Sequence, residues 1–326
     1  SLFSSSPADA AKFYGSINFD KLPAKMRPDI LYKSAWAVAQ AGDRETAAKL
    51  LTTFIDGYPR DPRICEALTL RGDMYAKTKK ETEALQDFDR VIARWPKEES
   101  AAAAWQRAAQ IYAGRQDLAN MAKYYEGLIK NFPKTSPAAL AEAHFLLGRA
   151  AFDQGDFQSS ISHMSEAKTL DPQKYGEQVN VLTVLSYHKL QDVNKLKEAL
   201  ETLQKENPAA VSRVPDVIPA WLGLQAYGMK DLETADKYMT WATQNDQLQN
   251  VKKVIWRNLA KVRLALKKYD RALVASNNFL KVEDQPYRRA DGMLDKASIL
   301  LGLGKYAEAR KTAEEALALG VEGPLM

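Results

Sequence analysis

The chain has 326 residues, of which 46% are hydrophobic and 27% charged, and its formal net charge is +5 at pH 7. This composition is typical of a folded protein and excludes an intrinsically disordered chain. The Lys and Arg residues alternate with Asp and Glu and form no long basic run, so we expect no nucleic-acid partner.

The first 27 residues precede the repeated part of the chain and predict an N-terminal arm or linker. Ser4-Ser5-Ser6-Pro7 combines favoured N-cap residues with a proline at the first helical position, which predicts a short capping helix at about residues 7–14. The segment 18–28 predicts a linker. The chain has a single cysteine, Cys65, so an internal disulfide is excluded.

A sequence pattern recurs from about residue 28 to residue 320. Pro59, Pro96, Pro133 and Pro172 end four amphipathic stretches at intervals of 37, 37 and 39 residues. The same residue types precede each proline at similar distances. The clearest unit contains Leu68, Gly72, Tyr75, Ala84, Phe88, Val91 and Pro96.

These residues resemble the signature of the tetratricopeptide repeat (TPR), a hairpin of two helices. The resemblance implies an all-α fold, a right-handed α-solenoid (superhelix) of about eight TPR hairpins. We expect the hairpins near residues 28–60, 65–97, 102–134, 141–173, 177–209, 216–248, 253–285 and 290–320, which form one array over 28–320, with a tail at 321–326.

The physical chemistry of the pattern explains why it recurs. Small residues such as Gly72, Ala84 and Gly148 allow two helices to approach closely where they cross. Turn sequences such as Ala41-Gly42-Asp43 separate the two helices of a hairpin, and a proline ends the second helix. Each hairpin buries one of its faces only by stacking on its neighbours.

The last hairpin is expected to leave one side uncovered. Its second helix, predicted at residues 306–319, carries Ala313, Ala316 and Leu317, and the sequence shows no terminal element with a polar outer face. Solenoids normally need such an element. We therefore expect that the chain originally continued, that a partner packs there, or that the protein self-associates through this C-terminal hairpin.

No constellation of residues predicts an enzyme, a metal site or a cofactor. The three histidines, His144, His163 and His188, are 19 and 25 residues apart, which matches no metal-binding motif. Cys65 lies next to Glu66 at a helix start, where a lone buried cysteine is the common case. We expect a protein that catalyses nothing itself.

The resemblance implies that the first helix of every hairpin lines a concave face that binds a partner. The residues expected on this face are Phe145, Arg149, Leu182, Leu185, Trp221, Leu224, Tyr227, Arg257, Asn258 and Lys261. They predict an apolar groove flanked by basic groups, which suits an amphipathic helix or an extended peptide with acidic ends. The alternative is that several of the aromatic residues pack inside the array, because the concave-face positions and the core positions of a repeat differ by one residue of helical register.

The linkers between hairpins resemble those of bacterial envelope TPR proteins. Tyr58-Pro59-Arg60-Asp61-Pro62 and the segment 131–137 (Asn-Phe-Pro-Lys-Thr-Ser-Pro) carry this resemblance. It implies a scaffold of an envelope complex in the periplasm or at the outer membrane, with the cytoplasm as the alternative. No apolar run is long enough to insert into a bilayer. The alternative function is an interaction or oligomerisation segment of a longer protein.

Overall fold

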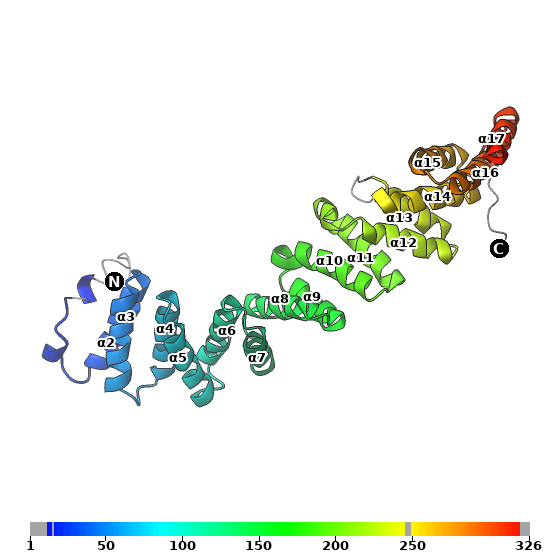
Figure 1. The fold of residues 1–326 in the computed structure, drawn as a ribbon. Coiled ribbons are helices and arrows are strands. Elements are labelled where there is room, and N and C mark those ends of the chain that lie inside the picture. The colour runs from blue at the N-terminus through cyan, green and yellow to red at the C-terminus, as the bar shows by residue number, and fades with distance from the viewer. Residues whose placement is uncertain (1–11, 15, 245–248, 320–326) are drawn as a thin grey trace. The chain divides into compact units, whose positions relative to one another are not determined.

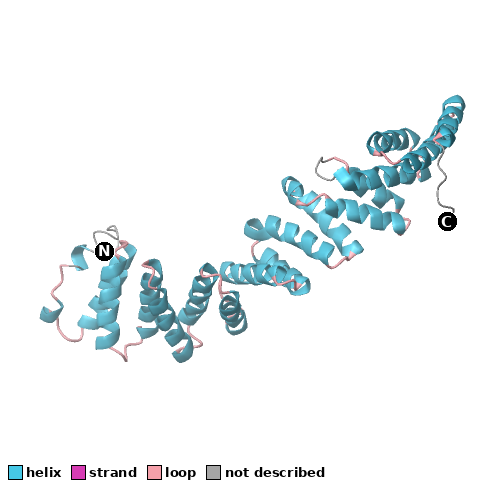
Figure 2. Cartoon of the chain, viewed as in Figure 1, coloured by secondary structure: helices cyan, strands magenta, loops and turns pink. Residues whose placement is uncertain are grey.

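In the computed structural model, residues 12–14, 16–244 and 249–319 are described, and every regular element among them is a helix (Figures 1 and 2). The capping helix predicted at residues 7–14 falls mostly outside these residues, although residues 12–14 are helical. Contacts divide the chain into two compact units, residues 1–176 and 177–326. Helix α10 (Pro172–Lys189) contains the boundary between them.

The first unit is built from four hairpins that follow one another along the chain. Its elements are η2 (Phe19–Lys21), α2 (Arg27–Gln40), α3 (Arg44–Gly57), α4 (Ile64–Lys77), α5 (Glu81–Arg94), α6 (Glu99–Gly114), α7 (Leu118–Asn131), α8 (Pro137–Asp153) and α9 (Phe157–Leu170). The second helix of each of the first three hairpins also contacts the first helix of the next one. The fully buried side chains between them include Leu51, Phe54, Leu68, Phe88 and Tyr125. This sequential stacking is the α-solenoid arrangement that the sequence predicts.

The second unit continues the same plan within itself. It contains the rest of α10, α11 (Val193–Glu206), η3 (Pro208–Arg213), α12 (Val217–Gly228), α13 (Leu232–Ala242), α14 (Gln249–Ala265), α15 (Tyr269–Val282), α16 (Pro286–Gly302) and α17 (Tyr306–Ala318). One cluster of buried residues joins α10, α11, α12 and α13, and another joins α12 to α16. The eight hairpins of the described residues are therefore α2–α3, α4–α5 and so on to α16–α17.

The prolines of the pattern take two different roles. Helices α3, α5 and α7 each end two residues before Pro59, Pro96 and Pro133, as predicted. Pro172 instead is the first residue of α10, directly after Asp171 at the end of α9. Proline is tolerated at that position because the first backbone N–H groups of a helix have no partner within the helix.

All eight hairpin turns contain one residue with a left-handed backbone conformation. Glycine occupies this position in three turns, and Lys or Gln occupies it in the other five. The residues are Gly42, Lys79, Gln116, Gly155, Gln191, Lys230, Lys267 and Gly304, with φ between 56° and 91°. Only glycine adopts this conformation without a steric penalty, so five of the turns are strained.

We expect Lys79→Gly to raise the free energy of unfolding. Relief of the left-handed strain, about 1–2 kcal/mol, exceeds the conformational entropy that a glycine costs, about 0.5–1 kcal/mol, so the net gain should be roughly 0.5–1 kcal/mol. The urea midpoint measures the change. Lys77→Gly, in the last turn of α4, is the matched control and should lower the midpoint. A Lys79→Gly variant that loses as much stability as Lys77→Gly contradicts the strain argument.

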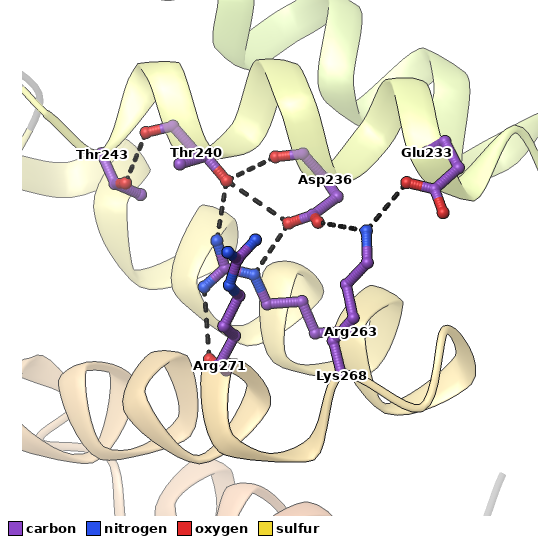
Figure 3. Close-up of polar contacts among 7 residues, drawn as sticks. All are labelled: Glu233, Asp236, Thr240, Thr243, Arg263, Lys268 and Arg271. Atoms are coloured by element: carbon purple, nitrogen blue, oxygen red, sulfur yellow. Dashed lines mark hydrogen bonds and ion pairs between the residues drawn. The ribbon is translucent and has the colours of Figure 1, made fainter.

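A network of charged and hydroxyl groups with a buried centre joins α13, α14 and α15 (Figure 3). The Arg263 Nε donates to Asp236 Oδ1 at 2.8 Å, and its Nη2 donates to the Thr240 hydroxyl at 2.8 Å. Lys268 Nζ donates to Asp236 Oδ2 at 3.0 Å and to Glu233 at 2.8 Å. Arg263 and Asp236 are 8% and 7% exposed, so this pair holds consecutive hairpins together inside the second unit.

The last hairpin differs in one respect from the expectation. Ala316, which we expected to be uncovered, is 4% exposed, and Ala313 is half-buried; α17 packs on α16, the other helix of its hairpin. Leu317 is 77% exposed, as expected. The uncovered apolar surface of α17 is therefore smaller than predicted and is centred on Leu317 and Tyr306.

Candidate functional site

Two of the predicted partner-binding residues, Phe145 and Arg149 of α8, lie in the first unit. The Phe145 ring stacks on that of Tyr175 with 4.6 Å between ring centroids, and Phe145 is half-buried. Arg149 is exposed and has no charged partner among the described residues. Phe145 thus contributes to packing between hairpins, and only Arg149 is freely available to a ligand.

Elsewhere in the first unit, polar pairs connect the first helices of successive hairpins. The Tyr32 hydroxyl of α2 donates to Glu66 of α4 at 3.0 Å, and Arg107 of α6 pairs with Asp73 of α4 at 3.0 Å. Gln106 and Gln110 of α6 both donate to Glu142 of α8. This surface is therefore polar, and its polar groups already satisfy one another.

Five predicted residues lie on α10 and α12 in the second unit, and all are half-buried. They are Leu182, Leu185, Trp221, Leu224 and Tyr227. Leu185 and Trp221 pack against the buried cluster around α11. The ring of Trp221 also makes an edge-to-face contact with that of His188, with 5.4 Å between ring centroids. Leu224 and Tyr227 pack against the cluster around α14. Each side chain thus presents one side to the core and the other to solvent.

The remaining three residues, Arg257, Asn258 and Lys261 of α14, line a common cavity of about 310 Å³. The other residues that line it are Lys253, Val254, Phe279, Glu283 and Arg288. The spacing of Arg257, Asn258 and Lys261 places them on one face of α14, and α15 and the start of α16 supply the other walls. The structure thus brings together the three α14 residues that the sequence proposed.

The cations around this cavity are largely paired, unlike the free basic flank that the sequence predicted. Arg257 bonds to Asp291 and lies 3.5 Å from Asp295, and Lys261 Nζ lies 3.6 Å from Asp295. The Lys253 Nζ lies 2.7 Å from Asp284. The pairs between α14 and α16 neutralise most of this charge, so the site is polar but not strongly basic.

Exposed apolar side chains lie on α12, α14 and α16, and sequence reasoning missed them; one of them, Val254, lines the cavity. Val217 of α12, Val254 of α14 and Leu294 and Leu301 of α16 are 44–54% exposed. Val217 lies one turn before Trp221, and Val254 lies one turn before Arg257 and Asn258. Leu294 lies one turn after Asp291, the partner of Arg257, and Leu301 lies two turns further along α16. We give the name α12–α14–α16 face to the nine residues Val217, Trp221, Leu224, Val254, Arg257, Asn258, Lys261, Leu294 and Leu301. The repeat pattern does contain a sign of these exposed residues, because Val217 and Val254 occupy the same position in successive repeats.

His144 of α8 and His163 of α9 form a pair that the sequence did not predict. Their Nδ1 atoms are 3.0 Å apart, their rings are tilted by 44°, and both are half-buried. Burial lowers the pKa of both imidazoles, and the neighbouring His163 lowers that of His144 further. No group of three or more potential ligand side chains in the described part of the chain is arranged to hold a metal ion.

These lowered pKa values predict a loss of stability in acid. As the pH falls below the ordinary histidine pKa of 6.5, these two histidines bind protons in the unfolded chain before they do so in the folded protein. The free energy of unfolding therefore decreases as the pH falls from 6.5 through the folded pKa. We expect the urea midpoint to fall less between pH 7.5 and pH 5 in a His144→Gln, His163→Gln variant than in the wild type. An equal fall in both proteins would contradict this.

Within the described residues, no helix combines the length and the apolar character that a bilayer span requires. Family models described as tetratricopeptide repeats match residues 32–99 and 257–324 (one model), 103–135 (a second) and 141–174 (a third). Together the matches cover more than half of the chain. Among curated proteins, none matches this chain by sequence.

Several solved structures resemble the chain at low sequence identity. A TPR protein from Parabacteroides merdae is 13% identical with a TM-score of 0.45, covering 84% of this chain and 98% of its own. The C-terminal part of a TPR repeat-containing protein from Cytophaga hutchinsonii is 13% identical with a TM-score of 0.48, and the match covers 88% of this chain and 94% of that one. MamA from Desulfovibrio magneticus is 19% identical with a TM-score of 0.40, covering 62% and 99%. The repeat assignment itself rests on the family models and on the hairpins described above.

Proposed function

The chain belongs to the tetratricopeptide-repeat family, and we propose that it is a non-enzymatic scaffold that binds a protein or peptide partner on its α12–α14–α16 face. The observation that carries this proposal is the set of four apolar side chains on α12, α14 and α16, each 44–54% exposed, one of which, Val254, lines a cavity of about 310 Å³. Exposed apolar residues gathered in this way are typical of interaction sites, whereas single ones are not. The half-buried aromatic residue of the face, Trp221, can anchor a partner without large loss of side-chain entropy.

The polar groups of the face define the partner further. Asn258 and Arg288 line the cavity and can donate hydrogen bonds, while the paired Arg257 and Lys261 can share their donors with an incoming carboxylate. Such a face fits an amphipathic helix or an extended peptide that carries apolar side chains and an acidic group. Leu182, Leu185 and Tyr227, half-buried on α10 and α12 of the same unit, extend the proposed contact surface, and Arg149 of the first unit is a separate candidate.

We also propose that the partner belongs to a bacterial envelope complex, in the periplasm or at the outer membrane. This finer proposal is supported by the resemblance of the inter-hairpin linkers, such as Tyr58-Pro59-Arg60-Asp61-Pro62, to those of envelope TPR proteins. The presence of one cysteine, Cys65, which is buried, is compatible with an oxidising compartment.

Val254→Asp and Leu294→Asp are expected to reduce partner recovery from an extract of the source organism by at least about tenfold, because each buries a charge against the apolar partner. Both side chains are about half exposed, so neither change should lower the thermal midpoint appreciably. Val274→Asp on α15 is the matched control, since Val274 is 57% exposed and lies outside the face. Equal recovery by Val254→Asp and Val274→Asp would exclude this face as the docking site.

A second candidate function is self-association through the C-terminal hairpin, as an interaction segment of a longer protein. The exposure of Leu317 (77%) and Tyr306 (71%) on α17 favours it. Light scattering over a hundredfold range of concentration tests it. A mass that rises with concentration in the wild type, and not in Leu317→Asp, would support self-association, and a constant monomer mass would exclude it.

A further inference from the structure

The His144–His163 pair has a geometry that fits a bound metal ion. The two Nδ1 atoms face one another at 3.0 Å across the α8–α9 hairpin. A tetrahedral Zn²⁺ ion with two imidazole ligands at 2.0–2.1 Å holds its two nitrogen atoms about 3.3 Å apart. A widening of a few tenths of an ångström, within reach of small rotations about χ2, would therefore let both nitrogens bind one ion.

The hairpin itself holds the pair in place. His144 and His163 occupy the same two repeat positions as Trp105 and Tyr124 in the preceding hairpin, whose rings are also in contact, at 5.3 Å. The neighbouring Gly148 lets α8 and α9 approach closely, since a Cβ added to it would lie 3.2 Å from the Cβ of His163. Two helices thus supply one ligand each, and neither ligand lies on a loop.

Carboxylates lie close enough to favour a cation at this place. Glu166, three residues after His163 on the same face of α9, interacts electrostatically with both imidazoles. Glu126 of α7 and Asp156 at the start of α9 interact with His163. These three side chains lower the cost of bringing a dication between α8 and α9, and Glu166 is the one placed on the helix face of a ligand.

We propose that His144 and His163 form a binding site for a divalent transition-metal ion of the Zn²⁺ class. The two Nδ1 lone pairs bind the ion, and water molecules fill the remaining positions. The imidazole that donates the hydrogen bond in the free pair carries its proton on Nε2 in the bound state, so both rings stay neutral and no proton is released. The ion joins α8 to α9 and stabilises the fourth hairpin by mass action.

Calorimetric titration of the untagged wild type with ZnCl₂ at pH 7.5 tests the proposal. We expect one equivalent of Zn²⁺ to bind with a Kd below about 100 µM, and His144→Gln and His163→Gln to weaken binding by at least about tenfold. His188→Gln is the matched control, because His188 packs against Trp221 and has no imidazole partner, and it should bind as the wild type does.

A wild-type Kd above about 100 µM, or equal affinity in His163→Gln, would overturn the proposal. Because a variant of the pair can fail to fold, Cu²⁺ bound to the wild type gives an independent result by electron paramagnetic resonance. Hyperfine coupling to two nitrogen ligands would support the site, and a spectrum of oxygen ligands alone would overturn it.

Discussion

Replacing Asp236 with alanine is expected to lower the free energy of unfolding of the second unit by about 3–5 kcal/mol, because it leaves Arg263 buried without its carboxylate. Arg263 is 8% exposed, and Asp236 is its only acidic partner among the described residues (Figure 3). Lys268 would lose one of its two carboxylates at the same time. Urea unfolding followed by circular dichroism measures the change.

Two control variants separate the buried charge from the loss of a side chain. Replacing both partners, as Asp236→Ala with Arg263→Met, removes the unpaired charge and should restore most of the stability. Glu314→Ala breaks the exposed pair with Arg310 and should have no measurable effect. If the double variant is less stable than Asp236→Ala alone, the account of the network is wrong.

Burial raises the pKa of Asp236, but hydrogen bonds from Arg263 and Lys268 outweigh it and leave the pKa below its ordinary value of 3.8. The network therefore contributes stability above this value and loses it as the pH falls through the folded pKa. Asp236→Ala should consequently flatten the dependence of stability on pH in the acid range.

Replacing Gly223 with leucine should destabilise the second unit by more than about 3 kcal/mol, beyond the usual 1–3 kcal/mol of overpacking. A Cβ at this position of α12 would lie 2.7 Å from Met239 Cγ and 2.9 Å from the Met239 backbone nitrogen of α13. A side chain can rotate away from such a contact, but the backbone of α13 cannot. The thermal midpoint, with helix content measured at low temperature, reports the loss.

Gly228→Ala, at the end of the same helix, is the matched control, because a Cβ there meets no atom within 4 Å. We expect this variant to be at least as stable as the wild type. Gly148→Leu in the first unit should lower the free energy of unfolding less than Gly223→Leu does, since a Cβ at Gly148 meets only the side chains of Met164 and His163. If Gly223→Leu and Gly228→Ala change the thermal midpoint equally, α12 and α13 do not cross as closely as described.

The hairpins could be predicted from the sequence because their signals are local. Small residues such as Gly72 and Gly148 do lie where two helices cross, next to Phe88 and Met164. Turn sequences such as Ala41-Gly42-Asp43 do separate helices, and Asp43 accepts a hydrogen bond from the Thr46 backbone N–H. Each signal depends on a few neighbouring residues, so it needs no knowledge of the rest of the fold.

Other features depend on contacts between hairpins, which the sequence did not reveal. The pairing of Arg257 and Lys261 with Asp295 removes the predicted basic flank, because helices one repeat apart lie side by side. The spacing of the histidines alone does not predict the His144–His163 contact, which follows from the repeat positions that Trp105 and Tyr124 occupy in the preceding hairpin. The division into two units was not predicted, since the pattern continues through the boundary within α10.

The left-handed turn residues show a further limit of the sequence. Gly42 and Gly155 mark this conformation, but Lys79 and Gln116 adopt it as well, although neither favours it. Closure of the hairpin imposes it there, and the packing of the two helices outweighs a strain of about 1–2 kcal/mol. Alignment of the repeats, rather than residue preference, would have identified these positions.

Photo-crosslinking in the source organism tests the central claim, partner binding on the α12–α14–α16 face, most directly. A photoreactive phenylalanine analogue is placed in turn at Val254 and Leu294 on this face and at Val274 on α15, all exposed positions. Our account predicts that both face positions give an adduct with the same partner and that Val274 gives none. An adduct from Val274 alone, or no adduct from either face position, would contradict it.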